Sequence, residues 1–194
     1  MIKAVIFDFF GVLSTEGFRL FCDTYFPDNK DKRRQALELV TQHDAGSVTK
    51  DQYANGLAKL AGVSLEVVYE HMSANKPNKL LLDYIRKELK PKYKVSVLSN
   101  AGDNYISQVL NPADLDMFDD IILSYQYGMV KPQVEIFELA AERLGVLTTE
   151  CLFIDDSQSH CDGARRAGMK TIFYKDLFDF KKQIGKILSS VADN

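Results

Sequence analysis

An apolar, β-branched segment near the start of the chain constrains the fold most. Residues 2–7 (Ile-Lys-Ala-Val-Ile-Phe) are too uniformly apolar for an edge strand, and the segment stops at Asp8. Such a run is typical of a strand buried on both faces, as in a parallel sheet. Four later segments have the same character, and we expect them to be the other strands: 93–99, 121–124, 151–155 and 170–174.

Helical patterns separate these expected strands. Residues 133–144 place their apolar side chains on one stripe and end at Gly145, a residue that commonly stops a helix. Residues 78–89 have a second such pattern and lead back into the sheet through Pro91. Strands that alternate with helices predict an α/β protein with a Rossmann-like, doubly wound parallel sheet.

One long segment, 14–79, breaks this alternation. It contains four helix-like stretches, for which Thr49 and Ser64 are candidate N-caps: 16–25, 30–42, 50–60 and 65–73. Its aromatic residues are best explained as the core of a small helical bundle. We therefore predict an α/β core formed by residues 1–13 and 80–194, with residues 14–79 as an inserted helical cap.

Composition narrows the function classes. The 194 residues include 24 Lys and Arg against 27 Asp and Glu, which argues against a basic nucleic-acid binder or a binder of anionic membranes. Three cysteines without a CxxC pair argue against a disulfide framework and a cysteine-based zinc site. No apolar run approaches the roughly 20 residues of a membrane span. We expect a cytoplasmic protein, a monomer or small homo-oligomer, without nucleic-acid or membrane partners.

Polar residues follow four of the expected strands, where ligands bind in open parallel sheets. They are Asp8, the pair Ser99-Asn100, Lys131 and the pair Asp155-Asp156. Three carboxylates at one place repel one another, and Mg²⁺ relieves that conflict because it prefers carboxylate and water oxygens. A lysine with hydroxyl and amide groups could then hold phosphate oxygens. This set favours phosphoryl transfer, whereas no GxxxxGK[ST] phosphate-binding loop occurs in the sequence.

Four motifs occur in an order that resembles the haloacid dehalogenase superfamily. They are FDFFGVL (7–13), VLSNA (97–101), GMVKP (128–132) and FIDDSQSHCDGARRAG (153–168). The helical insertion is similar to the small cap of subfamily IA, which includes sugar-phosphate phosphatases and the phosphatase domain of soluble epoxide hydrolases. Within it, the segments look most like the glucose-1-phosphate phosphatase type. The resemblance implies a Mg²⁺-dependent phosphatase acting on a small phosphorylated metabolite, possibly a sugar phosphate.

The resemblance also implies a role for each motif residue. Asp8 would be the nucleophile that forms an aspartyl-phosphate. Mg²⁺ would be held by Asp8, the backbone carbonyl of Phe10 and Asp156, with Asp155 acting directly or through water. Ser99, Asn100 and Lys131 would bind the transferring phosphoryl group. We also expect the turn that begins His43-Asp44 to contact the substrate, although a plain connection between helices explains it equally well.

Two positions depart from the family pattern. Most phosphatases of the superfamily have a general acid–base Asp two residues after the nucleophile, where this chain has Phe10. Two alternatives therefore stay open: a catalytically weak or silent member that binds a phosphorylated ligand or a partner, and a 2-haloacid dehalogenase. The second departure is His160, where relatives often have Asn; we favour a histidine that orients Asp155 or Asp156 over a replacement proton donor.

Overall fold

The computed structural model describes residues 1–189, and within them the strands form a five-stranded parallel sheet with the order β3-β2-β1-β4-β5. Strand β1 lies at the centre, where Phe7 is in register with Val97 on one side and Ile154 on the other. The strands are β1 (Ala4–Phe7), β2 (Lys94–Ser99), β3 (Asp120–Leu123), β4 (Cys151–Asp155) and β5 (Lys170–Phe173). The predicted Rossmann-like sheet is confirmed, and every strand ends at the same edge.

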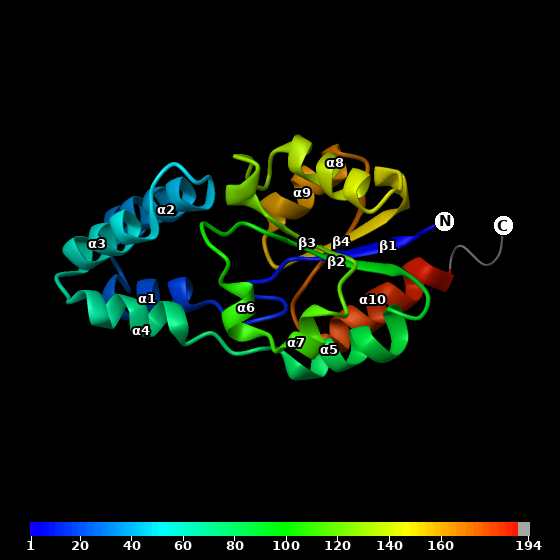
Figure 1. Ribbon diagram of the computed structural model, residues 1–194, viewed down its shortest axis with the longest axis horizontal. Coiled ribbons are helices and arrows are strands. Elements are labelled where there is room, and N and C mark those ends of the chain that lie inside the picture. The colour runs from blue at the N-terminus through cyan, green and yellow to red at the C-terminus, as the bar shows by residue number, and fades with distance from the viewer. Residues whose placement is uncertain (190–194) are drawn as a thin grey trace.

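Alternate side chains of β1 enter two different hydrophobic cores. Val5 and Phe7 pack into the core beneath helices α5 (Lys79–Tyr84) and α10 (Leu177–Ser189), whereas Ala4 and Ile6 face α8 (Val134–Arg143) and α9 (Gln158–Arg166). Figure 1 shows these two helical layers on opposite faces of the sheet. Both faces of the central strand are therefore buried, which explains its continuous apolar sequence.

Four helices between β1 and α5 form a separate bundle at one end of the molecule (Figure 1). We call them the helical insert. Their facing side chains make a third hydrophobic core that includes Phe21, Phe26, Tyr53 and Leu57. The helices are α1 (Gly17–Tyr25), α2 (Lys30–Asp44), α3 (Lys50–Ala61) and α4 (Leu65–Ser73).

Several element boundaries differ from the predictions. Helix α2 continues through Asp44, so His43 and Asp44 belong to its last turn, and the chain reverses at Ala45 and Gly46, whose φ is +71°. The predicted helix 78–89 begins at Lys79 and changes to a π-helical turn at Ile85–Leu89. Thr49 caps α3 through the backbone N–H of Gln52, as predicted, whereas the Ser64 side chain forms no capping hydrogen bond to α4.

Short elements complete the loops that leave the sheet. They are α6 (Ile106–Val109), α7 (Pro112–Leu115) and the 3₁₀ turns Ser124–Gln126 and Thr148–Glu150. Among the described residues, no helix is long and apolar enough to cross a membrane. Cys22, Cys151 and Cys161 are free and buried.

Candidate active site

An ionic cluster lies at the carboxyl ends of β1 and β4. The Nζ atom of Lys131 donates hydrogen bonds to Oδ1 of Asp8 at 2.6 Å and to Oδ2 of Asp155 at 2.8 Å. All three residues are buried, with exposed fractions of 3%, 6% and 0%. The parallel sheet thus brings together three residues that the sequence separates by up to 147 positions, from Asp8 to Asp155.

The charges of this cluster depend on one another. Burial raises the pKa of Asp8, the nearby Asp155 carboxylate raises it further, and Lys131 only partly compensates. Burial also opposes ionisation of Asp155, but Lys131 and a hydrogen bond from His160 outweigh burial and lower its pKa. Lys131 keeps its proton, because the two carboxylates overcome the effect of burial on its pKa. The site therefore holds a buried cation whose position is set by two acidic side chains.

Asn100 fixes the main chain of Lys131. Its side-chain Oδ1 accepts from the Lys131 backbone N–H at 2.8 Å, and its Nδ2 donates to the Lys131 carbonyl at 3.1 Å. The preceding residue, Ser99, is the last residue of β2 and is fully buried, and its Oγ lies 3.4 Å from the Asn100 carbonyl oxygen. Asn100 lines the cavity described below, whereas Ser99 is not one of its lining residues.

Asp156 lies beside the ionic cluster and contacts both parts of the molecule. A Cβ atom built on Gly11 would lie 2.4 Å from Oδ2 of Asp156, so only glycine permits this approach, and its φ of +87° also favours glycine. The same Oδ2 accepts a hydrogen bond from Arg19 of helix α1 at 2.7 Å. The guanidinium Nε of Arg19 also pairs with Glu16 at 2.8 Å.

Three carboxylates could hold a metal ion at this edge. One oxygen from each of Asp8, Asp155 and Asp156 lies within 4.8 Å of the others. Hard oxygen donors of this kind suit Mg²⁺, and the repulsion that raises the pKa of Asp8 is the conflict that a divalent cation removes. These three carboxylates therefore fit the Mg²⁺ ion that the sequence motifs imply.

His160, in the first turns of α9, contacts Asp155 directly. Its Nδ1 lies 3.1 Å from both carboxylate oxygens of Asp155, and the backbone N–H of Ser157 donates to Oδ1 at 2.8 Å. These contacts hold the Asp155 carboxylate in one orientation. They agree with our preference for a positioning histidine.

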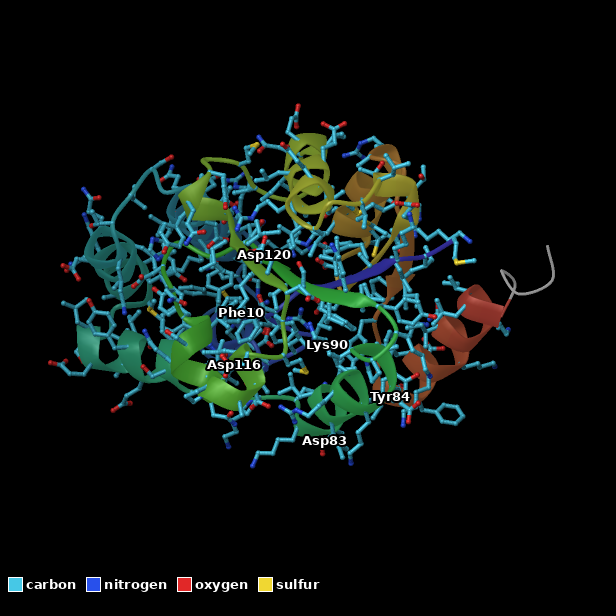
Figure 2. The ribbon with its side chains drawn as sticks, turned by 45° about the vertical axis from the view of Figure 1, so that its right-hand side comes forward. Phe10, Asp83, Tyr84, Lys90, Asp116 and Asp120 are labelled. Carbon is cyan, nitrogen blue, oxygen red and sulfur yellow. The ribbon has the colours of Figure 1, made fainter. Side chains whose placement is uncertain are left out.

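A cavity of about 440 Å³ separates the ionic cluster from the helical insert. Asp8, Lys131 and Asp156 line it from the sheet, and Glu16, Arg19 and Asp44 line it from the insert. Phe10 also lines the cavity, with its ring edge-on to Phe9 at 5.0 Å between centroids. Figure 2 shows Phe10 where the insert and the sheet meet. A residue with an apolar side chain thus lies at the cavity wall, two positions after the predicted nucleophile.

The two predicted residues of the insert have different environments. His43 is buried and stacks on Tyr53 at 4.8 Å, and its ring nitrogens lie 3.2 Å from the Val48 carbonyl and the Tyr105 hydroxyl. Burial lowers its pKa. Asp44 lies on the cavity wall, and its main-chain carbonyl accepts from Ser124 Oγ at 2.5 Å. His43 therefore fastens the insert to the core, and the Asp44 side chain faces the cavity.

Sequence reasoning missed the pair Glu16 and Arg19. Both line the cavity, and Arg19 is the link between the insert and Asp156. A signal was present: opposite charges three residues apart, shortly after the first motif and at the start of a predicted helix. That pattern alone is equally typical of a solvent-exposed helix face.

The fold and site define an α/β protein with an acidic, lysine-containing centre at the end of a parallel sheet, facing a helical insert. Residues 2–168 match the model of the haloacid dehalogenase-like hydrolases, and the chain belongs to this family. It is a hydrolase of that family by both its fold and its motifs.

Relatives with the same fold include phosphatases. D-ribitol-5-phosphate phosphatase from Bacteroides thetaiotaomicron is 27% identical over 98% of this chain and 100% of its own length. A family enzyme from the same organism, solved in complex with magnesium and inorganic phosphate, is 28% identical with a TM-score of 0.72 over 90% of this chain and 95% of its own. L-2-haloacid dehalogenase from Xanthobacter autotrophicus shares the fold at 21% identity and a TM-score of 0.65, covering 88% and 76% of the two chains.

Proposed function

We propose that this protein is a Mg²⁺-dependent phosphatase that hydrolyses a small phosphorylated metabolite, such as a sugar or polyol phosphate. The observation that carries this proposal is the contact of Lys131 with both Asp8 and Asp155 at the cavity floor, beside Asp156. The chain is similar over nearly its whole length to a ribitol-5-phosphate phosphatase, and this similarity supports the proposed substrate class.

Mg²⁺ would be held by Asp8, Asp155 and Asp156, together with the backbone carbonyl of Phe10. When bound, it supplies positive charge beside the phosphate and lets neighbouring carboxylates stay ionised. A family structure that contains magnesium and phosphate supports this assignment. Phe10 would contribute only its main chain, so its phenyl ring does not prevent metal binding.

The chemistry would begin at Asp8. A carboxylate oxygen of Asp8 attacks phosphorus, the bond to the substrate oxygen breaks, and an aspartyl-phosphate forms. Lys131 would neutralise charge on the transferring group, Asn100 holds Lys131 in place, and the Asn100 backbone would bind phosphoryl oxygens. The Ser99 hydroxyl, which lies 3.4 Å from the Asn100 carbonyl, would have to turn toward the phosphate to join them. Water then cleaves the aspartyl-phosphate and releases inorganic phosphate.

The helical insert would act as the cap of this site. In the proposed division, residues 1–13 and 80–194 form the core and 14–79 form the cap. The insert has its own hydrophobic core and supplies one wall of the cavity, which supports that division. A cavity of about 440 Å³ suits a small substrate better than a folded phosphoprotein.

The partners and the cellular compartment that we propose follow from the sequence. The small excess of acidic residues disfavours nucleic acid and anionic membrane as partners. Three free cysteines are consistent with a reducing cytoplasm. We propose a cytoplasmic monomer or small homo-oligomer.

A phosphate-release assay tests the proposal. Purified protein is incubated with a panel of sugar, polyol and aryl phosphates, with Mg²⁺ and with EDTA. We expect Mg²⁺-dependent release that Asp8→Asn abolishes. Asp31→Asn is the matched control, because Asp31 is exposed on α2, away from the cavity, and pairs with Arg34 of the same helix. Release that persists in Asp8→Asn would contradict the proposed mechanism.

Phe10 supports a second candidate, a weak or silent member that binds a phosphorylated ligand. Phe10 lines the cavity, and a phenyl ring cannot transfer a proton. Wild-type protein and Phe10→Asp that both release no phosphate, but bind phosphorylated ligands, would favour this alternative. A dehalogenase is less consistent with the site, because Asp155 and Asp156 are both present and suit a metal. Halide release unaffected by EDTA would favour a dehalogenase.

A further inference from the structure

The cavity contains a carboxyl group that the mechanism above leaves without a role. Asp44 ends helix α2 and lines the cavity that Asp8 and Lys131 line from the sheet. Among residues 1–189, no side chain or main-chain group forms a hydrogen bond with its carboxyl, whereas its main-chain carbonyl accepts from Ser124 Oγ. The carboxyl is therefore available to a molecule in the cavity.

The position of Asp44 is fixed from two sides. Ser124, directly after β3, holds its main chain, and the neighbouring His43 is bonded to Tyr105 of the core. A Cβ atom built on Gly102 would lie 2.3 Å from the His43 ring, so the two segments meet closely. Asp44 thus faces the reaction centre from a well-anchored turn of helix, as a group that exchanges a proton with the substrate must.

Most of the other proton-bearing groups of the cavity already have partners within the protein. Lys131 is held by two carboxylates, and Glu16 by Arg19. Both ring nitrogens of His43 have partners within the protein. Nδ1 of His160 faces Asp155, and only its Nε2 has no partner among residues 1–189, so the His160→Ala variant discussed below tests that alternative. Asp44 is the remaining acid on the cavity wall.

Asp44 also differs from an ordinary surface aspartate in its charge state. Burial raises its pKa to about 7, Lys131 partly opposes that rise, and Glu16 adds to it. The phenols of Tyr53 and Tyr105 also lie near it and keep their own protons, because burial raises both pKa values. A group with a pKa near neutrality can donate a proton and then recover it.

We propose that Asp44 is the proton donor for the leaving group, in the place of the general acid that Phe10 removes. This inference rests on the proposed phosphatase function. Asp8 forms its bond to phosphorus as the bond to the ester oxygen breaks, and the Asp44 carboxyl gives its proton to that oxygen, which leaves as an alcohol. The Asp44 carboxylate then accepts a proton from the water that attacks the aspartyl-phosphate. Inorganic phosphate is released, and both aspartates return to their starting forms.

Substrates with different leaving groups test this role. Ribitol 5-phosphate must release a strongly basic alkoxide, which needs a proton, whereas p-nitrophenyl phosphate releases a weakly basic phenolate, which does not. We expect Asp44→Asn to lower kcat/KM for the alkyl ester by about 100-fold or more, the usual worth of general acid catalysis. For the aryl ester we expect a change of no more than a few-fold. Because kcat/KM covers the steps through departure of the leaving group, the later attack of water does not obscure the comparison.

Two further variants separate catalysis from binding. Adding Phe10→Asp to Asp44→Asn should selectively restore kcat/KM for the alkyl ester, because the new Asp puts a carboxyl two residues after Asp8. Asp31→Asn, which alters an exposed carboxyl on the same helix α2, should leave the ratio of alkyl to aryl kcat/KM unchanged. In the wild type, kcat/KM for the alkyl ester should fall as pH rises above about 7, and that for the aryl ester should not.

The outcomes distinguish this inference from the proposed function. If Asp44→Asn lowers kcat/KM equally for both substrates, or leaves kcat/KM for the alkyl ester unchanged, then Asp44 is not the proton donor even though the protein is a phosphatase. If Asp8→Asn retains activity on both esters, the phosphatase mechanism itself is wrong. A selective loss of kcat/KM for the alkyl ester, restored by Phe10→Asp, would establish Asp44 as the proton donor.

Discussion

Arg19 of helix α1 donates a hydrogen bond from Nη2 to Oδ2 of Asp156 at 2.7 Å, and so links the helical insert to a predicted metal ligand. The guanidinium is half exposed, with 60% of its side-chain surface accessible. An exposed ion pair of this kind is worth about 1 kcal/mol or less. The contact therefore places a competing cation beside the proposed metal site without closing it.

Removing this cation should strengthen Mg²⁺ binding. We expect Arg19→Ala to lower the Kd for Mg²⁺ by about two- to fivefold, because Asp156 then does not have to break its ion pair with Arg19 in order to bind the metal. Titration calorimetry measures the change. Arg33→Ala is the matched control, since Arg33 pairs with Asp23 within the insert at 2.7 Å. Weaker Mg²⁺ binding in Arg19→Ala would show that Arg19 positions Asp156 instead of competing for it.

Gly11 should be essential to the metal site for a steric reason. In Gly11→Ala, the new methyl group would collide with the Asp156 carboxylate at 2.4 Å, and we expect at least a tenfold loss of Mg²⁺ affinity. Gly62→Ala is the matched control, because Gly62 has a similar φ of +74° but no atom within 4 Å of its Cβ position. Both variants should lose about 1 kcal/mol of stability from backbone strain. Equal Mg²⁺ affinities for the two would exclude the proposed role of Asp156.

The raised pKa of Asp44 predicts a pH-dependent stability. Below about pH 4 the carboxyl is protonated in both the folded and the unfolded chain. Between about pH 4 and 7 the Asp44 carboxyl ionises only in the unfolded chain, so the free energy of unfolding falls as pH rises. Above about pH 7 the carboxyl is ionised in the folded protein too, and the loss of stability is complete. We expect Asp44→Asn to be more stable than the wild type at pH 8, by roughly 2 to 4 kcal/mol, and equally stable near pH 4.

Urea unfolding at both pH values measures that difference. Asp31→Asn, the same change at an exposed position of helix α2, is the control. A constant difference between Asp44→Asn and the wild type from pH 4 to pH 8 would mean that Asp44 is not buried as a neutral acid.

His160 should orient Asp155 without carrying the reaction's proton. We expect His160→Ala to reduce kcat by a factor of about 3 to 30 and to leave the shape of the pH–rate profile unchanged, because Asp155 loses one of its hydrogen bonds. His160→Asn, which keeps a donor on the same helix, should recover much of the loss. The disappearance of an ionisation from the profile would instead identify His160 as an acid or base.

The sequence predicted the sheet well because its signals are local. The β-branched run before Asp8 reflects burial on both faces of a central strand, and Cys151–Asp155 and Leu65–Ser73 occur with the predicted bounds. The end of α2 was wrong by two residues, since the predicted turn at His43 is helical. Packing of His43 against Tyr53 and Tyr105 stabilises that extra turn, and such contacts are invisible in a local pattern.

The residue types of the site were readable in the same way, but their relations were not. That Asp8, Lys131 and Asp155 would meet followed from strand ends that share one edge of a parallel sheet. Which cavity groups have partners and which do not depends on contacts between distant segments: Arg19 with Asp156, and Ser124 with Asp44. Local sequence determined the elements and their chemistry, whereas burial and charge at Asp44 exist only once the insert packs against the sheet.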